Sequence, residues 1–362
     1  MKLKLCVSIL LSLSIFTNPT SEWHSEENNY WQEYLEAAPD GLVPENPDEA
    51  LWGIGVESLL SEIFSAFDNG VGDAMSFFVM LLGIALIIAT SESVTPIENV
   101  SLAKNSSAAI SVISSVLIFG RIGALCFSVR ESLESLSAFF AGIIPILTGI
   151  LTAGGNINSS ASQAFNMNVT LGAVSYLTAE ILIPLVFALF ALALAASVDG
   201  GAISSVAKGI KNVFMWLVGI STAVIIGAVS MQSVITGAQD SAYLRAAKYA
   251  ASGMIPVVGS TVSGALSTLA GGLSYVKSIV GVSSVTVIVI MAISPLVTML
   301  MYRLAFSLSI TFLEFMGSVG GVRTFSAFRS SIDALISVYA LSAVVYISEV
   351  VVFIKSGVNV FG

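Results

Sequence analysis

The residues of this chain that could do chemistry are ionisable side chains set within long apolar runs. Glu180 and Arg121 lie well inside such runs, and Glu314 lies nearer the end of another. If the runs span a membrane, a charge at the bilayer centre is costly unless it is paired or hydrated, so these three are candidate intramembrane polar residues. For Glu180 and Glu314 the chemistry would be ion coupling through a carboxylate that faces a cavity. The structural alternatives are a helix–helix hydrogen bond for Glu180, an acidic partner for Arg121 and snorkelling to the interface for Glu314.

Motifs for catalysis, phosphate binding and metal binding are absent from the sequence. It contains no GxxxxGK(S/T), HExxH or GxSxG pattern. Its two cysteines, Cys6 and Cys126, and its single histidine, His24, form no disulfide pattern or ligand cluster. We therefore predict that the protein is not an enzyme and binds no cofactor or metal. Energy for any transport would come from a partner or an ion gradient.

A second set of candidates lies where glycine and proline interrupt the apolar runs. Arg245, Lys248, Gly253 and Pro256 belong to the stretch LRAAKYAASGMIPVVGS, and a shorter, similar stretch, AGIIPILTG, contains Pro145 and Gly149. A break frees backbone groups that hydrocarbon cannot satisfy, so it survives only against protein or a water-filled cavity. Paired breaks point to a transporter binding site. We predict re-entrant or cavity-lining segments, with these six as path or partner-interface residues. Interfacial anchoring is the alternative for Arg245 and Lys248.

The elements that must hold these residues are membrane-spanning helices. Of 362 residues, 56% are hydrophobic and 10% are charged, which is typical of an all-α polytopic integral membrane protein. The apolar runs predict seven or eight crossings. Their approximate ranges are 75–90, 108–129, 138–152, 171–196, 213–235, 257–280, 282–302, 304–316 and 332–354, with 138–152 as a short broken segment.

An internal duplication is indicated at an offset of 111 residues. This shift places Gly142–Leu147 on Gly253–Val258, and it places Pro184–Val186 on Pro295–Val297 without a gap. The repeating unit would be a long helix, a Gly/Pro-broken segment and a proline-containing helix. Chance similarity between apolar segments is the alternative, and a simple kink is the alternative to a cavity at Pro184 and Pro295.

Charge divides the chain unevenly. Between Thr17 and Asp73 there are thirteen acidic residues and no lysine or arginine, so the excess negative charge belongs to this region. The sequence shows no basic cluster of the kind that binds nucleic acid. Lysine and arginine divide equally between the two sides whether the broken segments are re-entrant or cross fully, so the positive-inside rule gives no orientation. The predicted organisation is a signal peptide or anchor (1–20), an acidic exported region (21–73), a first span and loop (74–107), repeat units (108–212 and 213–323) and a C-terminal membrane helix (324–362).

The stretch Leu244–Tyr249 followed by Gly253–Gly259 resembles the stage III sporulation protein AE family. That family has an LR-x-AK-aromatic stretch before a G-x-(I/V)-PV-(I/V)-G turn, and this chain departs from it at Ala246, where a polar residue is expected. The resemblance extends over most of the chain in layout and hydropathy. It implies a protein of the bacterial mother-cell membrane around the forespore, with its N-terminal region exported. The implied partners form one sporulation channel complex, which includes a secretion-type ATPase, small membrane proteins, ring-forming proteins and a forespore-side protein.

Three functional hypotheses follow. The first is a permease-like core subunit of the mother-cell-to-forespore channel, with the two broken segments near its path or at a partner interface. The second is an autonomous secondary transporter that couples to ions through Glu180 or Glu314. The third is a static membrane scaffold that only docks partner proteins.

Overall fold

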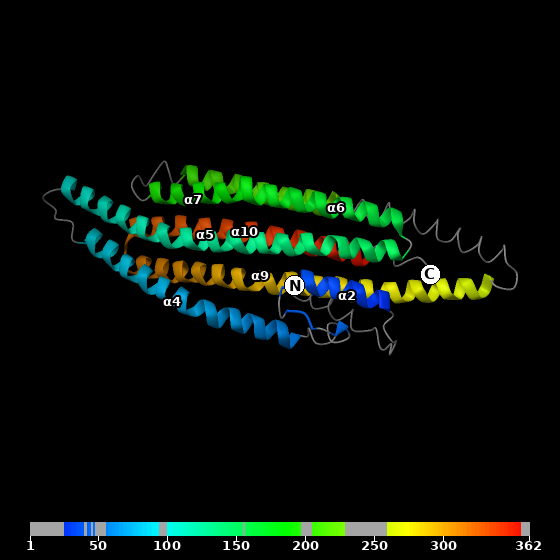
Figure 1. Cartoon of the computed structure of the whole chain (residues 1–362). Coiled ribbons are helices and arrows are strands. Elements are labelled where there is room, and N and C mark those ends of the chain that lie inside the picture. The colour runs from blue at the N-terminus through cyan, green and yellow to red at the C-terminus, as the bar shows by residue number, and fades with distance from the viewer. Residues whose placement is uncertain are drawn as a thin grey trace.

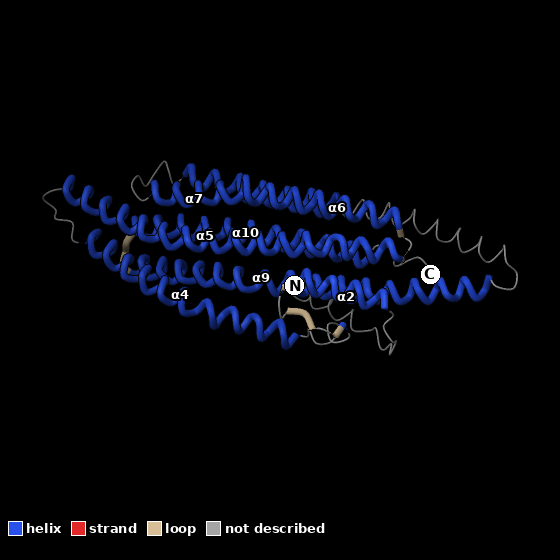
Figure 2. Tube along the Cα trace, viewed as in Figure 1, coloured by secondary structure: helices blue, strands red, loops and turns tan. Residues whose placement is uncertain are grey.

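The computed structural model describes residues 25–39, 42–44, 46–47, 56–93, 100–154, 156–196, 205–228 and 259–355. Within these ranges all regular secondary structure is helical, and the helices form an elongated bundle (Figures 1 and 2). The labelled elements are α2 (Ser25–Ala37), α4 (Val56–Ser93), α5 (Val100–Ala153), α6 (Ile157–Tyr176), the π-helical turn η2 (Leu177–Leu182), α7 (Ile183–Ala196), α9 (Gly259–Phe315) and α10 (Val319–Lys355). A further helix runs over Ser205–Ala228. The predicted all-α membrane class is confirmed.

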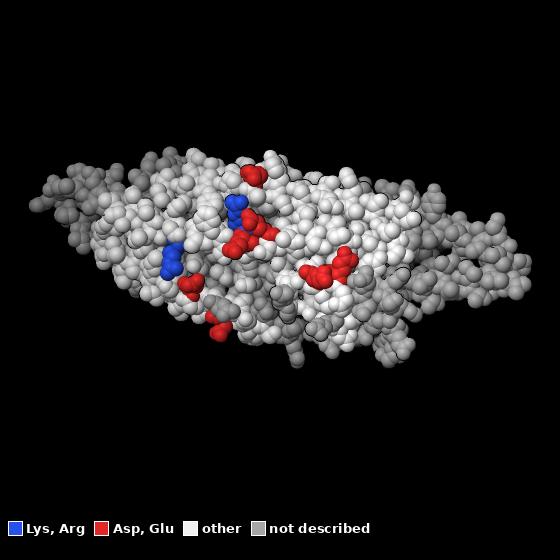
Figure 3. Space-filling view, viewed as in Figure 1, with Lys and Arg blue, Asp and Glu red and all other residues white. Residues whose placement is uncertain are grey.

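Six helices in the described part of the chain are long and apolar enough to cross a membrane. Most of them exceed one bilayer: α9 has 57 residues, or about 85 Å of helix, against about 30 Å of hydrocarbon. On the face shown in Figure 3, the described residues carry a few isolated groups of charged side chains and are otherwise uncharged. Such a surface suits contact with lipid.

The crossings differ from the seven or eight predicted, because several predicted segments belong to one helix. The ranges 108–129 and 138–152 both lie in α5, which continues through Pro145 to Ala153. The ranges 282–302 and 304–316 both fall within α9, except for residue 316, and Pro295 lies inside that helix. The prediction of a re-entrant segment at Pro145 is therefore wrong. A proline removes one helical hydrogen bond, and a membrane helix tolerates this loss when its surroundings satisfy the freed group.

The helix that contains Pro184 is also continuous, but it widens just before the proline. Pro184 has no N–H for the carbonyl of Glu180, and residues 177–182 form a π-helical turn in which the Ile183 N–H reaches the carbonyl of Thr178. The sequence left two interpretations of Pro184, a cavity and a simple kink. The local structure is a widened turn inside a continuous helix. The duplication stays a prediction, because its second proline motif, Gly253–Val258, lies outside the described residues.

Helix α9 packs against α4, α5 and α10. Its aromatic residues anchor the core. Phe77 of α4 stacks on Tyr302 at 4.5 Å between ring centroids, and Phe306 meets Phe325 of α10 edge-on at 5.7 Å. At one end of the bundle the last turns of α4 lie against the start of α10, with Ile88 and Glu92 beside Gly321 and Gly320. These contacts join α10, which carries part of the site, to α4 and α9.

Candidate functional site

Helix α6 buries most of its polar side chains and exposes apolar ones, with Asn158 and Asn168 as exposed exceptions. This pattern is the reverse of that in a helix of a water-soluble protein. Its buried residues are Ser159, Ser160, Gln163, Asn166, Met167, Thr170 and Val174. Its outward face carries Phe165 and Val169, which are 64% and 51% exposed. Lipid accepts such an apolar exterior, and the polar groups then find partners inside the bundle. We name the set Ser159, Ser160, Gln163, Asn166, Thr170 and Glu349 the polar seam.

Glu349 of α10 is the acid of the polar seam, and it is fully buried. The hydroxyl of Thr170 donates a hydrogen bond to its Oε1, and Nε2 of Gln163 lies 3.5 Å from its Oε2. A buried carboxylate is costly unless hydrogen bonds compensate for its lost hydration. Two side chains of α6 supply that compensation, so α6 and α10 are joined by a polar contact inside an apolar bundle.

The other end of the polar seam joins α6 to α5 close to Pro145. Ser160 Oγ lies 2.7 Å from the carbonyl oxygen of Thr148, and Thr152 Oγ1 lies 2.7 Å from Ser160 Oγ. The Thr148 hydroxyl in turn donates to the carbonyl of Ile144 at 2.8 Å. These hydroxyl groups cluster along the two turns of α5 that follow Pro145. The polar seam therefore extends across α5, α6 and α10.

Lys277 of α9 is buried at the same end of the bundle as Glu349. Among the residues that the structure describes, these two are the charged side chains in the buried class. Lys277 Nζ lies 5.2 Å from the ring centroid of Phe353, which follows Glu349 by one turn of α10, and no described group forms a hydrogen bond with it. A cation over an aromatic face is stabilised by the ring quadrupole. An acid and a base thus lie buried on adjacent helices.

The three candidate intramembrane residues are not brought together. Glu180 lies in η2 with an exposed side chain, so it does not face a cavity inside this bundle, and its predicted role stays a prediction. Arg121 is exposed and its Nη2 lies 3.4 Å from the hydroxyl of Ser76 on α4, a neutral partner in place of the expected acid. Glu314 is exposed one residue before the end of α9, which fits snorkelling.

Four of the six path or interface candidates, Arg245, Lys248, Gly253 and Pro256, lie outside the described residues. The other two lie in α5. Pro145 has an exposed side chain, and a Cβ built on Gly149 would lie 3.1 Å from Cε1 of Tyr30 in α2. In this structure Tyr30 covers the space over Gly149.

Helix α2 comes from the acidic N-terminal region and packs onto the bundle. A Cβ on Gly142 would lie 3.3 Å from Cβ of Ala37, so Gly142 and Gly149, two turns apart, both admit α2 closely. Trp31 and Tyr34 of α2 are fully buried. Burial raises the pKa of the Tyr34 phenol, and the Ser284 hydroxyl of α9 acts in the opposite direction. The glycines predicted to mark a break therefore accommodate a packed helix.

The polar seam itself was missed from sequence, although α6 carries a signal for it. Ser159, Gln163, Asn166 and Thr170 recur at intervals of four, three and four residues, which places them on one helical face. Glu349 lies near the end of the apolar range 332–354, a position from which a charged side chain can snorkel to the interface. Its burial depends on how α6 meets α10, which periodicity along one helix does not reveal.

Comparison with known proteins gives a family match and one distant relative. The family model described as stage III sporulation protein AE matches residues 51–357. The stage III sporulation protein AE of Bacillus subtilis (strain 168) is 20% identical over 256 residues, which is 70% of this chain. The match spans 64% of the length of that relative. No solved structure matches the chain.

Proposed function

This chain belongs to the stage III sporulation protein AE family, and we propose that it is a permease-like core subunit of the channel that joins the mother cell to the forespore. Within that complex the polar seam would line or gate the path. The partners would include a secretion-type ATPase, ring-forming proteins and small membrane proteins, and the protein would reside in the mother-cell membrane. A partner would supply energy, because the sequence carries no nucleotide-binding motif.

The observation that carries this proposal is the inward polar face of α6. The buried polar residues of α6 run from Ser159 to Thr170, which is roughly 17 Å along the helix, or about half the thickness of the hydrocarbon core. Phe165 and Val169, on the opposite face, are exposed and apolar. Polar groups that are hidden from lipid inside a membrane bundle are typical of ion and substrate pathways.

The distribution of cations supports an orientation. Five described cations lie in the half of the bundle where α4 ends and α10 begins, which we call the cationic end: Lys208, Lys211, Arg303, Arg323 and Arg329. The opposite half holds Lys277 and Lys355 among the described residues, and Arg121 and Arg130 lie near the middle of α5. Cations favour the cytoplasmic side, so the cationic end would face the mother-cell cytoplasm. Helix α2 would then lie toward the exported side, in agreement with the absence of cations from the N-terminal region.

A secondary transporter is the second candidate function, and the burial of Glu349 favours it. A buried carboxylate with a hydroxyl and an amide beside it is the kind of group that takes up a coupling proton or cation. Glu349 replaces Glu180 and Glu314 in this role, because both of those side chains are exposed. Substrate-dependent uptake by the purified protein alone in vesicles would support the transporter over the channel subunit.

The channel proposal is tested by removing the gene from its sporulating host and restoring it. We expect the deletion strain to complete engulfment but to form no heat-resistant spores. The wild-type gene should restore their formation. An affinity-tagged copy should isolate the other membrane proteins of the complex only from sporulating cells. Normal spore titres in the deletion strain would contradict a required role. Restoration of spores by a variant whose polar seam is blocked by Asn166→Leu would leave only the scaffold.

A further inference from the structure

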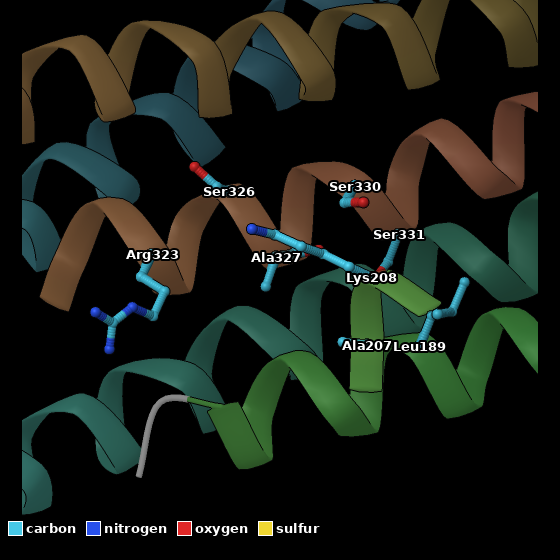
Figure 4. A pocket seen from close by; sticks show the side chains of 8 residues that line it. All are labelled: Leu189, Ala207, Lys208, Arg323, Ser326, Ala327, Ser330 and Ser331. Atoms are coloured by element: carbon cyan, nitrogen blue, oxygen red, sulfur yellow. The ribbon is translucent and has the colours of Figure 1, made fainter. Parts of the chain in front are cut away.

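A cavity of about 290 Å³ lies at the cationic end, between α7, the helix Ser205–Ala228 and α10 (Figure 4). Lys208 and Arg323 line it together with three serines of α10, Ser326, Ser330 and Ser331. In Figure 4 the Lys208 side chain extends along the cavity toward α10, from which Arg323 and the serines project. The Ser331 hydroxyl donates to the carbonyl of Ala327 at 3.2 Å, which leaves Ser326 and Ser330 as the hydroxyl donors beside the two cations. Two cations and hydroxyl donors around one cavity are the chemistry that binds a phosphate group.

Lys208 and Arg323 make no ion pair within the described part of the chain, whereas Lys211 and Arg303 do. Asp333 is shared by Lys211 and Arg303, at 3.7 and 2.6 Å. Glu92 of α4 lies against Gly320, one turn before Arg323, and reduces the positive potential on that side. Lys208 and Arg323 therefore keep charge that Asp333 and Glu92 do not neutralise by direct contact.

The surroundings of the cavity favour a lipid as the source of that phosphate. Leu189 forms an apolar part of the wall. Around the same end, Val206 and Val319 are 53% and 69% exposed, as expected for side chains in contact with acyl chains. A headgroup phosphate could sit between Lys208 and Arg323 while its acyl chains follow the apolar surface. We propose that this cavity binds the phosphate headgroup of an anionic phospholipid of the phosphatidylglycerol or cardiolipin class.

The site concerns the protein's lipid environment and does not depend on its channel role. Anionic lipid bound here would hold α7, the helix Ser205–Ala228 and α10 together at the cationic end. The bound lipid would stabilise the folded protein because it binds the native state alone.

The test measures the unfolding temperature of the purified full chain in detergent during lipid titration. We compare phosphatidylglycerol, cardiolipin, zwitterionic phosphatidylcholine and inorganic phosphate. The wild type should gain stability with the two anionic lipids and not with phosphatidylcholine. In Lys208→Gln/Arg323→Gln the half-saturating anionic lipid concentration should rise at least about tenfold, because both cations are lost. Arg130→Gln, an exposed residue paired with Glu134, is the control for loss of one charge elsewhere and should bind like the wild type.

Each other outcome overturns the proposal. Equal stabilisation of the double variant and the wild type would place lipid binding elsewhere. Equal stabilisation by phosphatidylcholine would remove the role of charge. Full stabilisation by inorganic phosphate, in competition with the lipid, would assign the cavity to a soluble phosphate. The charge-keeping variant Lys208→Arg/Arg323→Lys guards against misfolding, since it should retain the lipid effect.

Discussion

Thr170 on α6 donates a hydrogen bond to the carboxylate of Glu349 on α10, and both side chains are buried. The two residues lie 179 positions apart in the chain. Their contact therefore forms only when the C-terminal helix packs against α6. The contact supplies a hydrogen bond from the polar face of α6 to a carboxylate that has lost its hydration by burial in an apolar bundle.

Replacing Thr170 by valine should destabilise the protein by about 1–3 kcal/mol, because it leaves a buried carboxylate short of one donor at nearly constant volume. Thr170→Ser keeps the hydroxyl and should lose less. Denaturant unfolding in mild detergent measures both variants. A Thr170→Val protein as stable as the wild type would show that Glu349 does not depend on this donor.

A large side chain at Gly149 should displace α2. Gly149→Leu would drive its side chain into the ring of Tyr30, which already lies 3.1 Å from a Cβ built at this position. The readout is a disulfide between Ala37→Cys and Gly142→Cys, whose Cβ atoms would lie 3.3 Å apart, close to disulfide spacing. We expect efficient cross-linking when position 149 keeps its native glycine and little cross-linking in the Gly149→Leu variant.

The matched control for this experiment is Gly123→Leu in the same helix, because nothing lies within 4 Å of a Cβ at Gly123. Cross-linking should stay efficient in that variant. Equal yields for Gly149→Leu and Gly123→Leu would mean that α2 is not seated on the two glycines.

Close packing of α9 on α10 requires glycine at position 281. A Cβ there would overlap Cγ1 of Ile354, so Gly281→Val should lower stability by about 1–3 kcal/mol through overpacking. Adding Ile354→Ala should recover part of that loss, which a double-mutant cycle detects as a coupling energy. Gly219→Val, at a glycine with open space around it, corrects for helix propensity. Strictly additive effects at positions 281 and 354 would refute the contact.

The ion pairs of Asp333 should matter modestly. Lys211, Arg303 and Asp333 are partly exposed, at 28%, 45% and 27% of their side-chain surfaces, so solvent screens the interaction. Asp333→Asn should cost about 1 kcal/mol or less, and added salt should narrow its difference from the wild type. Glu134→Gln removes the more exposed pair of Arg130 and Glu134 and should have no measurable effect. A larger loss at Glu134 than at Asp333 would contradict this ranking.

The class of the protein and the location of its apolar runs could be predicted from sequence, because composition and run length report directly on membrane helices. The division into crossings could not. Pro145 suggested a break, yet α5 continues through it to Ala153, and the separate ranges 282–302 and 304–316 belong to one helix, α9. Loss of one backbone hydrogen bond does not end a helix when tertiary packing supports both halves.

The candidate site was less predictable than the fold, because burial of a charge depends on neighbouring helices. Glu180 looked central along the chain but lies on the outer face of η2, whereas Glu349 looked peripheral and is fully buried. The polar stripe of Ser159, Gln163, Asn166 and Thr170 was readable as one helical face. Its inward direction follows from the apolar residues Phe165 and Val169 on the opposite face, which prefer lipid.

The central claim, that the polar seam forms part of a path, is tested most directly by water access at Asn166. In a Cys6→Ala/Cys126→Ala background, Asn166→Cys and Val169→Cys would be labelled with a charged, water-soluble thiol reagent in sporulating cells. Asn166 is 7% exposed on the inner face of α6, and Val169 is 51% exposed on the outer face. The account predicts modification of Asn166→Cys when the sporulation proteins are assembled, with Val169→Cys protected by lipid. Modification of Val169→Cys and protection of Asn166→Cys under the same conditions would contradict it.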